Sequence, residues 1–189
     1  MTIETLFRPE SVAVIGASRT PGKVGHDILA NLIRDGYAGA IIPVNPGTET
    51  LFDLPCYPTL AAAGRKVDLA VIVVPRPLVR KAVVDSISAG VKAIIIITAG
   101  FRETGPEGLA LELELVELCR RRQVRLLGPN CLGLINTENN LNASFAGHMP
   151  KPGGISIFSQ SGALCTAMLD LAAGRHLGLA KLVSIGNKA

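Results

Sequence analysis

Short runs of valine, isoleucine and leucine, separated by helix-like segments, constrain the fold of this chain more than any other feature. The predicted strands lie at 11–18, 40–46, 68–75, 91–100 and 124–130, and the predicted helices at 24–36, 77–90 and 107–122. Strands without polar alternation are typical of a parallel sheet that helices cover on both faces. We therefore predict an α/β fold, a Rossmann-like doubly wound parallel sheet, with the strand order 3-2-1-4-5.

The character of the sequence changes after Asn130. Residues 131–153 are polar and turn-rich without periodicity, so we predict that they connect the first domain, 1–130, to a second one. Residues 154–189 then carry a strand, a helix and another strand, which predicts the start of a second α/β domain. One such unit cannot bury both faces of its sheet. Either it packs on the first domain or the chain is the front part of a longer protein, and we favour the second explanation.

The composition argues against several functional classes. The longest apolar runs are far shorter than the roughly 20 residues of a membrane helix, and the first residues lack the features of a signal peptide. Four cysteines without a CxxC pair suit reduced thiols in a cytoplasmic protein, and no metal site is predicted. Scattered basic residues, 4% aromatics and no tryptophan argue against a nucleic-acid partner. The net charge of +4 suits a polyanionic small molecule.

Turns rich in glycine, proline or hydroxyl groups follow the first four predicted strands, at 16–25, 44–47, 73–77 and 98–103. These turns meet at the carboxyl edge of a parallel sheet, where ligands bind in doubly wound folds. Backbone amides in the first turn, together with the start of the following helix, are expected to hold an anion.

The first turn departs from two common nucleotide motifs. A Walker A loop has four residues between its glycines and a hydroxyl after its lysine, whereas here five residues separate Gly16 from Gly22 and Val24 follows Lys23. The NAD fingerprint GxGxxG is also missing, and the second strand ends in Asn45-Pro46 without an acid to read the ribose. A nucleotide whose phosphates bind without a chelated metal fits better, and coenzyme A (CoA) is such a ligand.

Seven segments occur in the same order as in the CoA-binding α subunit, or α-like half, of NDP-forming acyl-CoA synthetases, and the chain resembles that family. The segments are SVAVIGASRTPGKVG, PVNP, VDLAVIVVP, IIITAGF, LLGPNCLG, LNASF and SQSGAL, and the resemblance runs from about Leu6 to the last residue. The family includes ADP-forming acetate–CoA ligase and, more distantly, succinyl-CoA synthetase. The same module is fused to some protein acetyltransferases. The resemblance implies that 154–189 starts a flavodoxin-like, succinyl-CoA-ligase-like domain.

The resemblance also assigns site residues. In the relatives, the turn matching 21–24 touches the CoA phosphates, the one matching Val74 and Pro75 borders the adenine nucleotide, and the one matching 98–100 follows the pantetheine arm. The implied cofactor-binding residues are Gly16, Ser18, Pro21, Gly22, Lys23, Val24, Pro46, Val74, Pro75, Thr98, Ala99, Gly100 and Asn130. The implied phosphate-binding residues are Ser159, Ser161 and Gly162. Gly47 stands where relatives offer a lysine.

The resemblance implies that this chain binds CoA or acyl-CoA. It would supply that site to a ligase that converts a carboxylate, CoA and ATP to acyl-CoA, ADP and phosphate. The family's phosphorylated histidine and its ATP-grasp half have no match here. We therefore expect no catalytic residue in this chain and no activity when it is alone, with ATP, ADP and Mg²⁺ reaching it only through an ATP-grasp β subunit or fused domain. Formation of a homo-oligomer is left open.

The sequence is also compatible with two other functions. One is a CoA-sensing module that regulates a protein acetyltransferase, and the other is a Rossmann domain that binds NAD(H) or ADP. Cys131 has no neighbouring base in sequence and is predicted to be a packing residue. The carboxylates Glu112, Glu114 and Glu117 alternate with leucines and are predicted to lie on a solvated helix face.

Overall fold

Five buried strands form a parallel sheet at the centre of the first unit, as the apolar runs predict. The computed structural model describes residues 3–189. The strands are β1 (Ser11–Ile15), β2 (Ala40–Val44), β5 (Leu69–Ile72), β6 (Ala93–Ile96) and β7 (Arg125–Leu127). Their order in the sheet is β2-β1-β5-β6-β7, and all neighbouring pairs are parallel. The predicted class, a doubly wound α/β fold, is confirmed.

The predicted order of the strands is wrong. The third strand, β5, lies beside β1 instead of beyond β2, so the order in chain numbering is 2-1-3-4-5. Pro43 gives a physical reason, because a proline inside a strand has no N–H to donate and confines that strand to the edge of a sheet. The chain therefore changes direction between β1 and β5, which places the topological switch point at the turns after these two strands.

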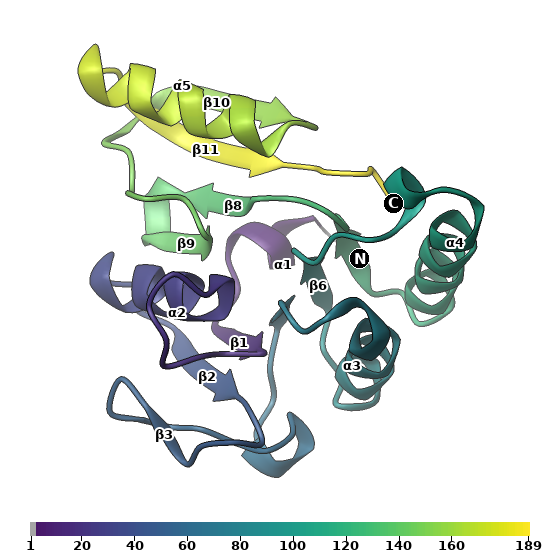
Figure 1. Ribbon diagram of the computed structural model, residues 1–189. Coiled ribbons are helices and arrows are strands. Elements are labelled where there is room, and N and C mark those ends of the chain that lie inside the picture. Colours follow the sequence, from purple (N-terminus) through teal and green to yellow (C-terminus); the bar gives the residue numbers. More distant parts are fainter. Residues whose placement is uncertain (1–2) are drawn as a thin grey trace.

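Successive residues of the strands enter two different cores. Val12 and Val14 pack on one face with residues of α2 (Val24–Arg34), while Ala13 and Ile15 pack on the other. That second face is covered by α3 (Arg76–Ser88) and α4 (Pro106–Arg121), which lie next to each other in Figure 1. Both faces of the sheet are thus buried, which explains why the strands lack polar alternation.

Shorter elements complete the first unit. They are α1 (Glu4–Phe7), β3 (Thr50–Leu51), β4 (Leu54–Pro55) and the 3-10 turns η1 (Ala61–Ala63) and η2 (Arg102–Thr104). The strands β3 and β4 pair as a small antiparallel hairpin that follows β2. Within residues 3–189, no helix is long and apolar enough to cross a membrane.

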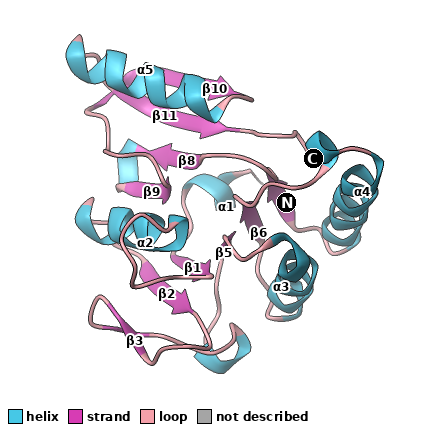
Figure 2. Cartoon of the chain, viewed as in Figure 1, coloured by secondary structure: helices cyan, strands magenta, loops and turns pink. Residues whose placement is uncertain are grey.

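A second sheet contains strands in the segment that the sequence predicted to be an irregular connector. Residues 131–153 hold β8 (Gly133–Asn136), η3 (Thr137–Asn139) and β9 (Leu141–Ser144). These join β10 (Pro152–Ser159) and β11 (Leu179–Ser184) in the order β10-β11-β8-β9, with α5 (Gly162–Gly174) on the sheet (Figure 2). Their strand character was hidden because Asn136, Asn142 and Ser144 are buried polar residues.

The second sheet packs against the first unit, and its two faces contribute to different cores. Leu134 and Leu141 join the core that holds Val12 and Val14, while the opposite face packs with Cys165 and its neighbours on α5. The side chain of Asn31, on α2, donates hydrogen bonds of 2.8 Å to the carbonyls of Ser144 and Ala146. A buried amide nitrogen that donates both of its hydrogens in this way fixes the position of the chain after β9.

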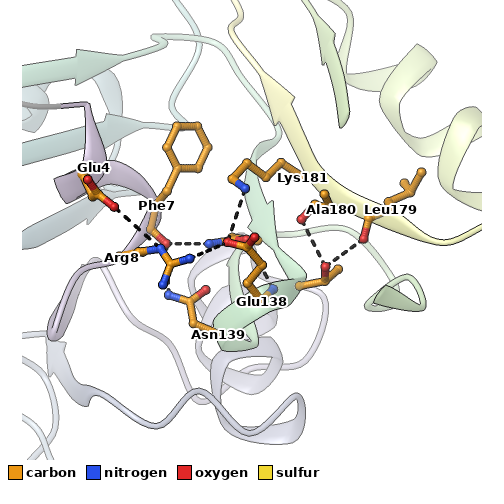
Figure 3. A network of polar contacts seen from close by, with 10 residues as sticks. Glu4, Phe7, Arg8, Glu138, Asn139, Leu179, Ala180 and Lys181 are labelled. Atoms are coloured by element: carbon orange, nitrogen blue, oxygen red, sulfur yellow. Dashed lines mark hydrogen bonds and ion pairs between the residues drawn. The ribbon is translucent and has the colours of Figure 1, made fainter. Parts of the chain in front are cut away.

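An exposed polar network also connects α1 to the second sheet (Figure 3). The guanidinium of Arg8 lies 2.8 Å from Glu138 and 3.7 Å from Glu4, and Lys181 Nζ lies 3.4 Å from Glu138. The side chain of Asn139 donates to the carbonyl of Phe7 at 3.0 Å. Ion pairs that are this exposed contribute on the order of 0–1 kcal/mol each, so this network orients α1 more than it stabilises the fold.

The predicted solvated face of α4 is wrong at Glu112. This residue is fully buried, and Arg102 Nε lies 2.6 Å from one of its carboxylate oxygens. The other oxygen accepts a hydrogen bond of 2.8 Å from the side chain of Asn187. Glu114 and Glu117 are exposed, which agrees with the predicted solvated face, and their side chains pair with arginines. Glu112 therefore joins α4 to the segment that follows β11.

Candidate functional site

The turn after β1 brings the start of α2 very close to the end of that strand. Gly16 has φ +97°, a left-handed conformation that favours glycine. A Cβ added to Gly25 would lie 2.1 Å from the carbonyl oxygen of Gly16, so only a glycine fits there. Lys23 is the N-cap residue of α2 and has no side-chain capping bond. The first amides of α2 and the Lys23 ammonium thus flank one short turn, an arrangement that favours an anion.

Side-chain hydrogen bonds link the neighbouring turns to one another. The amide of Asn45 donates to the carbonyl of Ala17 at 2.7 Å and accepts from the N–H of Gly47 at 2.7 Å. The hydroxyl of Thr98 donates to the carbonyl of Val74 at 2.7 Å. The turns after β1 and β2 are therefore held together, and so are the turns after β5 and β6.

A cleft of about 640 Å³ lies along this edge, and we call it the main cleft. Ten of the predicted site residues line it: Gly16, Ser18, Lys23, Val24, Val74, Pro75, Thr98, Ala99, Asn130 and Gly162. The structure thus brings together residues from the turns after β1, β5, β6 and β7, and from the start of α5. Lys23 is exposed beside the cleft, so a ligand can reach it.

The other predicted site residues lie outside the main cleft. Pro46 lines a neighbouring cavity of about 500 Å³, the side cavity, which shares Val74 and Pro75 with the main cleft. Pro21 and Gly22 are exposed on the turn between β1 and α2. A Cβ on Gly100 would lie 2.7 Å from Arg76 Cδ, so the Arg76 side chain covers that residue.

The two predicted phosphate-binding serines make local hydrogen bonds. Ser161 is the N-cap of α5, and its hydroxyl accepts from the N–H of Leu164 at 3.1 Å. The hydroxyl of Ser159 accepts from the N–H of Ser161, also at 3.1 Å. Neither serine lines the main cleft, whereas Gly162 does. The start of α5 reaches the cleft through its backbone.

Six lining residues were not predicted. They are Gly25, Val73, Ile97, Cys131, Leu132 and Phe145. Gly25 could have been predicted, because it is the third glycine of the first turn and a glycine at that place allows the helix to pack closely on the strand. Phe145 ends the segment LNASF, but its place in the cleft depends on β9, which the sequence did not predict.

Two cations belong to the first turn. Within residues 3–189, no ion pair involves Arg19 or Lys23. Arg19 donates to the hydroxyl of Thr48 at 2.5 Å and lines a shallow third cavity with His26 and Phe52. The charge of both side chains is therefore not neutralised by a carboxylate, and the turn presents a positive potential.

The four cysteines are free and buried. Burial raises the pKa of Cys131 to about 12 and that of Cys119 to about 11, and it also raises the pKa values of Cys56 and Cys165. A thiol with so high a pKa is protonated at neutral pH and is a poor nucleophile. This supports the prediction that Cys131 is a packing residue.

We expect all four thiols to react with iodoacetamide at pH 8 at least tenfold more slowly in the folded chain than in 8 M urea, because the thiolate is the reactive form. The rate in the folded chain is expected to rise with pH as the raised pKa values are approached. Mass spectrometry of the labelled peptides measures each rate, with the urea sample as the control. A cysteine that reacts at its unfolded rate would contradict the burial described for it.

Known proteins resemble this chain over nearly all of its length. Residues 10–137 match the family model of the CoA binding domain, and residues 152–189 match that of the succinyl-CoA ligase like flavodoxin domain. The chain is 48% identical to ADP-forming acetate–CoA ligase from Methanocaldococcus jannaschii, covering 96% of this chain and 25% of the relative. It is 44% identical to the α subunit of ADP-forming acetate–CoA ligase I from Pyrococcus furiosus, covering 100% and 42% respectively.

A solved structure of a related protein has the same fold over nearly the whole chain. The structure titled dinucleotide-forming acetyl-coenzyme A synthetase 1 from Ca. Korarchaeum cryptofilum, in complex with phosphate and ADP, superposes with a TM-score of 0.95 at 40% identity. The match covers 99% of this chain and 40% of that one. The chain thus spans between a quarter and about two fifths of the length of these relatives. Because one family model matches residues 10–137 of the 189, the chain belongs to the CoA-binding domain family.

Proposed function

We propose that this chain binds CoA or acyl-CoA in the main cleft, as the CoA-binding portion of an ADP-forming acyl-CoA ligase. The observation that carries the proposal is the course of the cleft. It begins at the turn after β1, with Lys23 and the start of α2, and passes the turns after β5 and β6 to the turn after β7. Three strand spacings separate β1 from β7, about 14 Å in all. A long, narrow ligand with phosphates at one end suits that shape.

The surroundings of Asn45 favour CoA over NAD. In an NAD site, an acid at the end of the second strand accepts the ribose hydroxyls. Here the side-chain amide of Asn45 donates to the carbonyl of Ala17 in the first turn and accepts from the N–H of Gly47 in its own turn. No side chain at this position is free to read a ribose diol, whereas the cations of the first turn suit the additional phosphate of CoA.

The relatives support a ligase over a sensing module, since three of them, at 44–48% identity, are named as ADP-forming ligases. We propose that the complete enzyme joins a carboxylate and CoA with ATP, and that an ATP-grasp partner or fused domain supplies the site for ATP, ADP and Mg²⁺. Gly162 at the start of α5 is proposed to face the phosphate through its backbone amide, with Ser159 and Ser161 shaping that turn. The reacting histidine is proposed to lie outside these 189 residues.

The remaining parts of the proposal concern organisation. We place the division between the two domains after Asn130 and assign β8 and β9 to the second domain, because they pair within its sheet. Free, buried cysteines suit a cytoplasmic protein. Analytical ultracentrifugation of the complete enzyme would measure whether it self-associates.

Calorimetric titration of the chain with CoA, dephospho-CoA, NAD and ADP tests the proposed ligand. We expect CoA to bind at least tenfold more tightly than NAD. NAD lacks the additional phosphate, and the acidic residue that binds the ribose in NAD sites is missing here. Dephospho-CoA is expected to lie between them. Binding of NAD that equals or exceeds that of CoA would refute the assignment.

A further inference from the structure

The exposed guanidinium of Arg19 joins two turns at the carboxyl edge of the sheet, and the proposed function gives it no role of its own. Arg19 belongs to the turn after β1, yet its Nη2 donates a hydrogen bond of 2.5 Å to the hydroxyl of Thr48, which follows β2. In the described part of the chain it has no carboxylate partner. Because a guanidinium has five N–H donors, Arg19 keeps donors for an anion.

A second contact keeps these two turns in the same relation. The side-chain amide of Asn45 donates to the carbonyl of Ala17 at 2.7 Å and accepts from the N–H of Gly47 at 2.7 Å. Ala17 lies two residues before Arg19, and Gly47 directly precedes Thr48. The guanidinium is thus held over the turn after β2 before any ligand arrives. A side chain that is already ordered in this way loses less conformational entropy on binding.

The strand order indicates which end of a CoA ligand lies near Arg19. In the proposed function, the pyrophosphate lies at Lys23, and the pantetheine arm follows the main cleft past β5 and β6 towards β7. On the other side of β1 lies β2. There the side cavity, of about 500 Å³, opens from the main cleft at Gly16 and reaches Asn45 and Pro46 at the end of β2. This side is left for the adenosine part of the ligand, so the phosphate on its ribose comes close to the turn that Arg19 covers.

Two other cations near this edge are less suited to that phosphate. Lys81 lines the side cavity, but its ammonium lies 2.5 Å from the carboxylate of Asp85, which lines the same cavity. Arg76 also lacks a carboxylate partner in the described residues, but its side chain covers Gly100 and lines a fourth cavity at the start of α4. It therefore lies towards β6, away from β2. Arg19 is the unneutralised cation on the side of the adenosine.

An anion has room beside the Arg19 guanidinium. The third cavity, of about 360 Å³, lies on one side of it, and its lining also includes His26 and the hydroxyl-bearing Thr50. None of the described residues that line this cavity is acidic. The carboxylate of Asp27 lies 3.0 Å from His26 Nδ1 and is not part of the lining. A phosphate next to Arg19 therefore meets donors and no lining carboxylate.

We infer that Arg19 binds the phosphate on the ribose of CoA, and that it is the residue by which this chain distinguishes CoA from dephospho-CoA. Lys23 and the start of α2 bind the pyrophosphate, which both ligands carry. A guanidinium pairs with two oxygens of one phosphate, which suits a terminal phosphate with three acceptor oxygens. The inference rests on the proposed function, because it requires that the main cleft hold CoA.

Calorimetric titration of the 189-residue chain and its variants with CoA and dephospho-CoA, at one salt concentration, tests this inference. Arg19→Ala is expected to weaken CoA binding at least tenfold and to leave dephospho-CoA within twofold of the wild type, so that the preference for CoA is lost. Lys23→Ala is expected to weaken both ligands by the same factor. Arg65→Ala is the matched control, because this exposed arginine precedes β5 at the opposite edge of the sheet. It is expected to change neither affinity by more than twofold.

A further variant returns the charge from the other turn. Because the Arg19 guanidinium reaches Thr48, a lysine at the preceding Gly47 would bring its ammonium to the same place. A Cβ at Gly47 would lie 3.2 Å from Asn45 Oδ1, the end of a side chain, so only a small shift is needed. Gly47→Lys in the Arg19→Ala chain is expected to restore a preference for CoA of at least threefold. A loss caused by local misfolding around Arg19 would not be reversed in this way.

The outcomes separate the two hypotheses. If the wild type binds CoA but Arg19→Ala keeps the preference for CoA over dephospho-CoA, the inference about Arg19 fails and the proposed function stands. The same conclusion follows if the wild type binds the two ligands equally, or if Arg65→Ala loses as much affinity for CoA as Arg19→Ala. If the wild type binds neither ligand, the proposed function fails, and the inference fails with it.

Discussion

Replacing Lys23 by glutamate is expected to weaken CoA binding at least a hundredfold while the chain remains folded. The wild-type ammonium stands beside the first amides of α2, where the proposed phosphates bind. A charge-assisted hydrogen bond contributes about 1.5–3 kcal/mol, and a hundredfold change in affinity corresponds to about 2.7 kcal/mol. The carboxylate also repels the phosphates, which adds to the loss. Calorimetry measures the affinity, and circular dichroism the fold.

Lys151→Glu is the matched control, because it makes the same change in net charge at an exposed position outside the main cleft. We expect its affinity for CoA to stay within about threefold of the wild type at physiological salt, where exposed charges more than about 8 Å away are screened. If the two variants lose the same affinity, the phosphates are attracted by overall charge and the Lys23 turn is not their site. If Lys23→Glu binds CoA normally, the phosphates bind elsewhere.

The substitution Gly25→Ala is expected to lower the free energy of unfolding by about 2 kcal/mol or more. Alanine normally stabilises a helix by about 1 kcal/mol relative to glycine. Here, however, the added methyl group would lie 2.1 Å from a backbone carbonyl oxygen of Gly16, and a backbone atom cannot turn away as a flexible side chain can. Overpacking of this kind costs about 1–3 kcal/mol beyond the gain in propensity, so α2 has to move away from β1. Urea denaturation measures the change.

Gly174→Ala tests whether the effect comes from the contact or from the loss of any helical glycine. Gly174 ends α5, and a Cβ there would meet nothing within 4 Å. We expect this variant to be as stable as the wild type or slightly more stable. Gly25→Ala is also expected to bind CoA more weakly, because the displaced helix start no longer lies against the turn. A Gly25→Ala chain with wild-type stability would show that the close approach of α2 to β1 is not required.

The elements that could be predicted are those whose local sequence determines them. The runs at Ser11–Ile15 and Ala93–Ile96 form strands because nearly every residue in them is apolar and β-branched or small. The order of the strands is not a local property, although Pro43 carried part of the information by confining β2 to an edge. The strands β8 and β9 were missed because buried polar side chains interrupt their apolar pattern. Asn136, for example, donates to the carbonyl of Phe7, far away in sequence.

The site could be predicted only in part, for the same reason. The turns after β1, β5 and β6 have recognisable sequences, so most residues there were identified and now line one cleft. The positions of Leu132 and Phe145 in the cleft depend on contacts between distant segments. Leu132 and Phe145 meet because β9 follows β8 in a sheet, and Glu112 is buried because Asn187 and Arg102 reach it. Pairings of this length leave no periodic trace in either segment.

The place of β11 between β10 and β8 has a consequence for synthesis on the ribosome. The five strands of the first sheet have all been translated at Leu127, but β8 pairs with β11, for example Asn136 with Lys181. The newly made β8 therefore has an unpaired edge until β11 leaves the exit tunnel, a stage at which chaperones commonly shield nascent chains. Gly162, which lines the cleft, lies on the helix between β10 and β11, so this side of the cleft takes its place only after β11 has paired with β8.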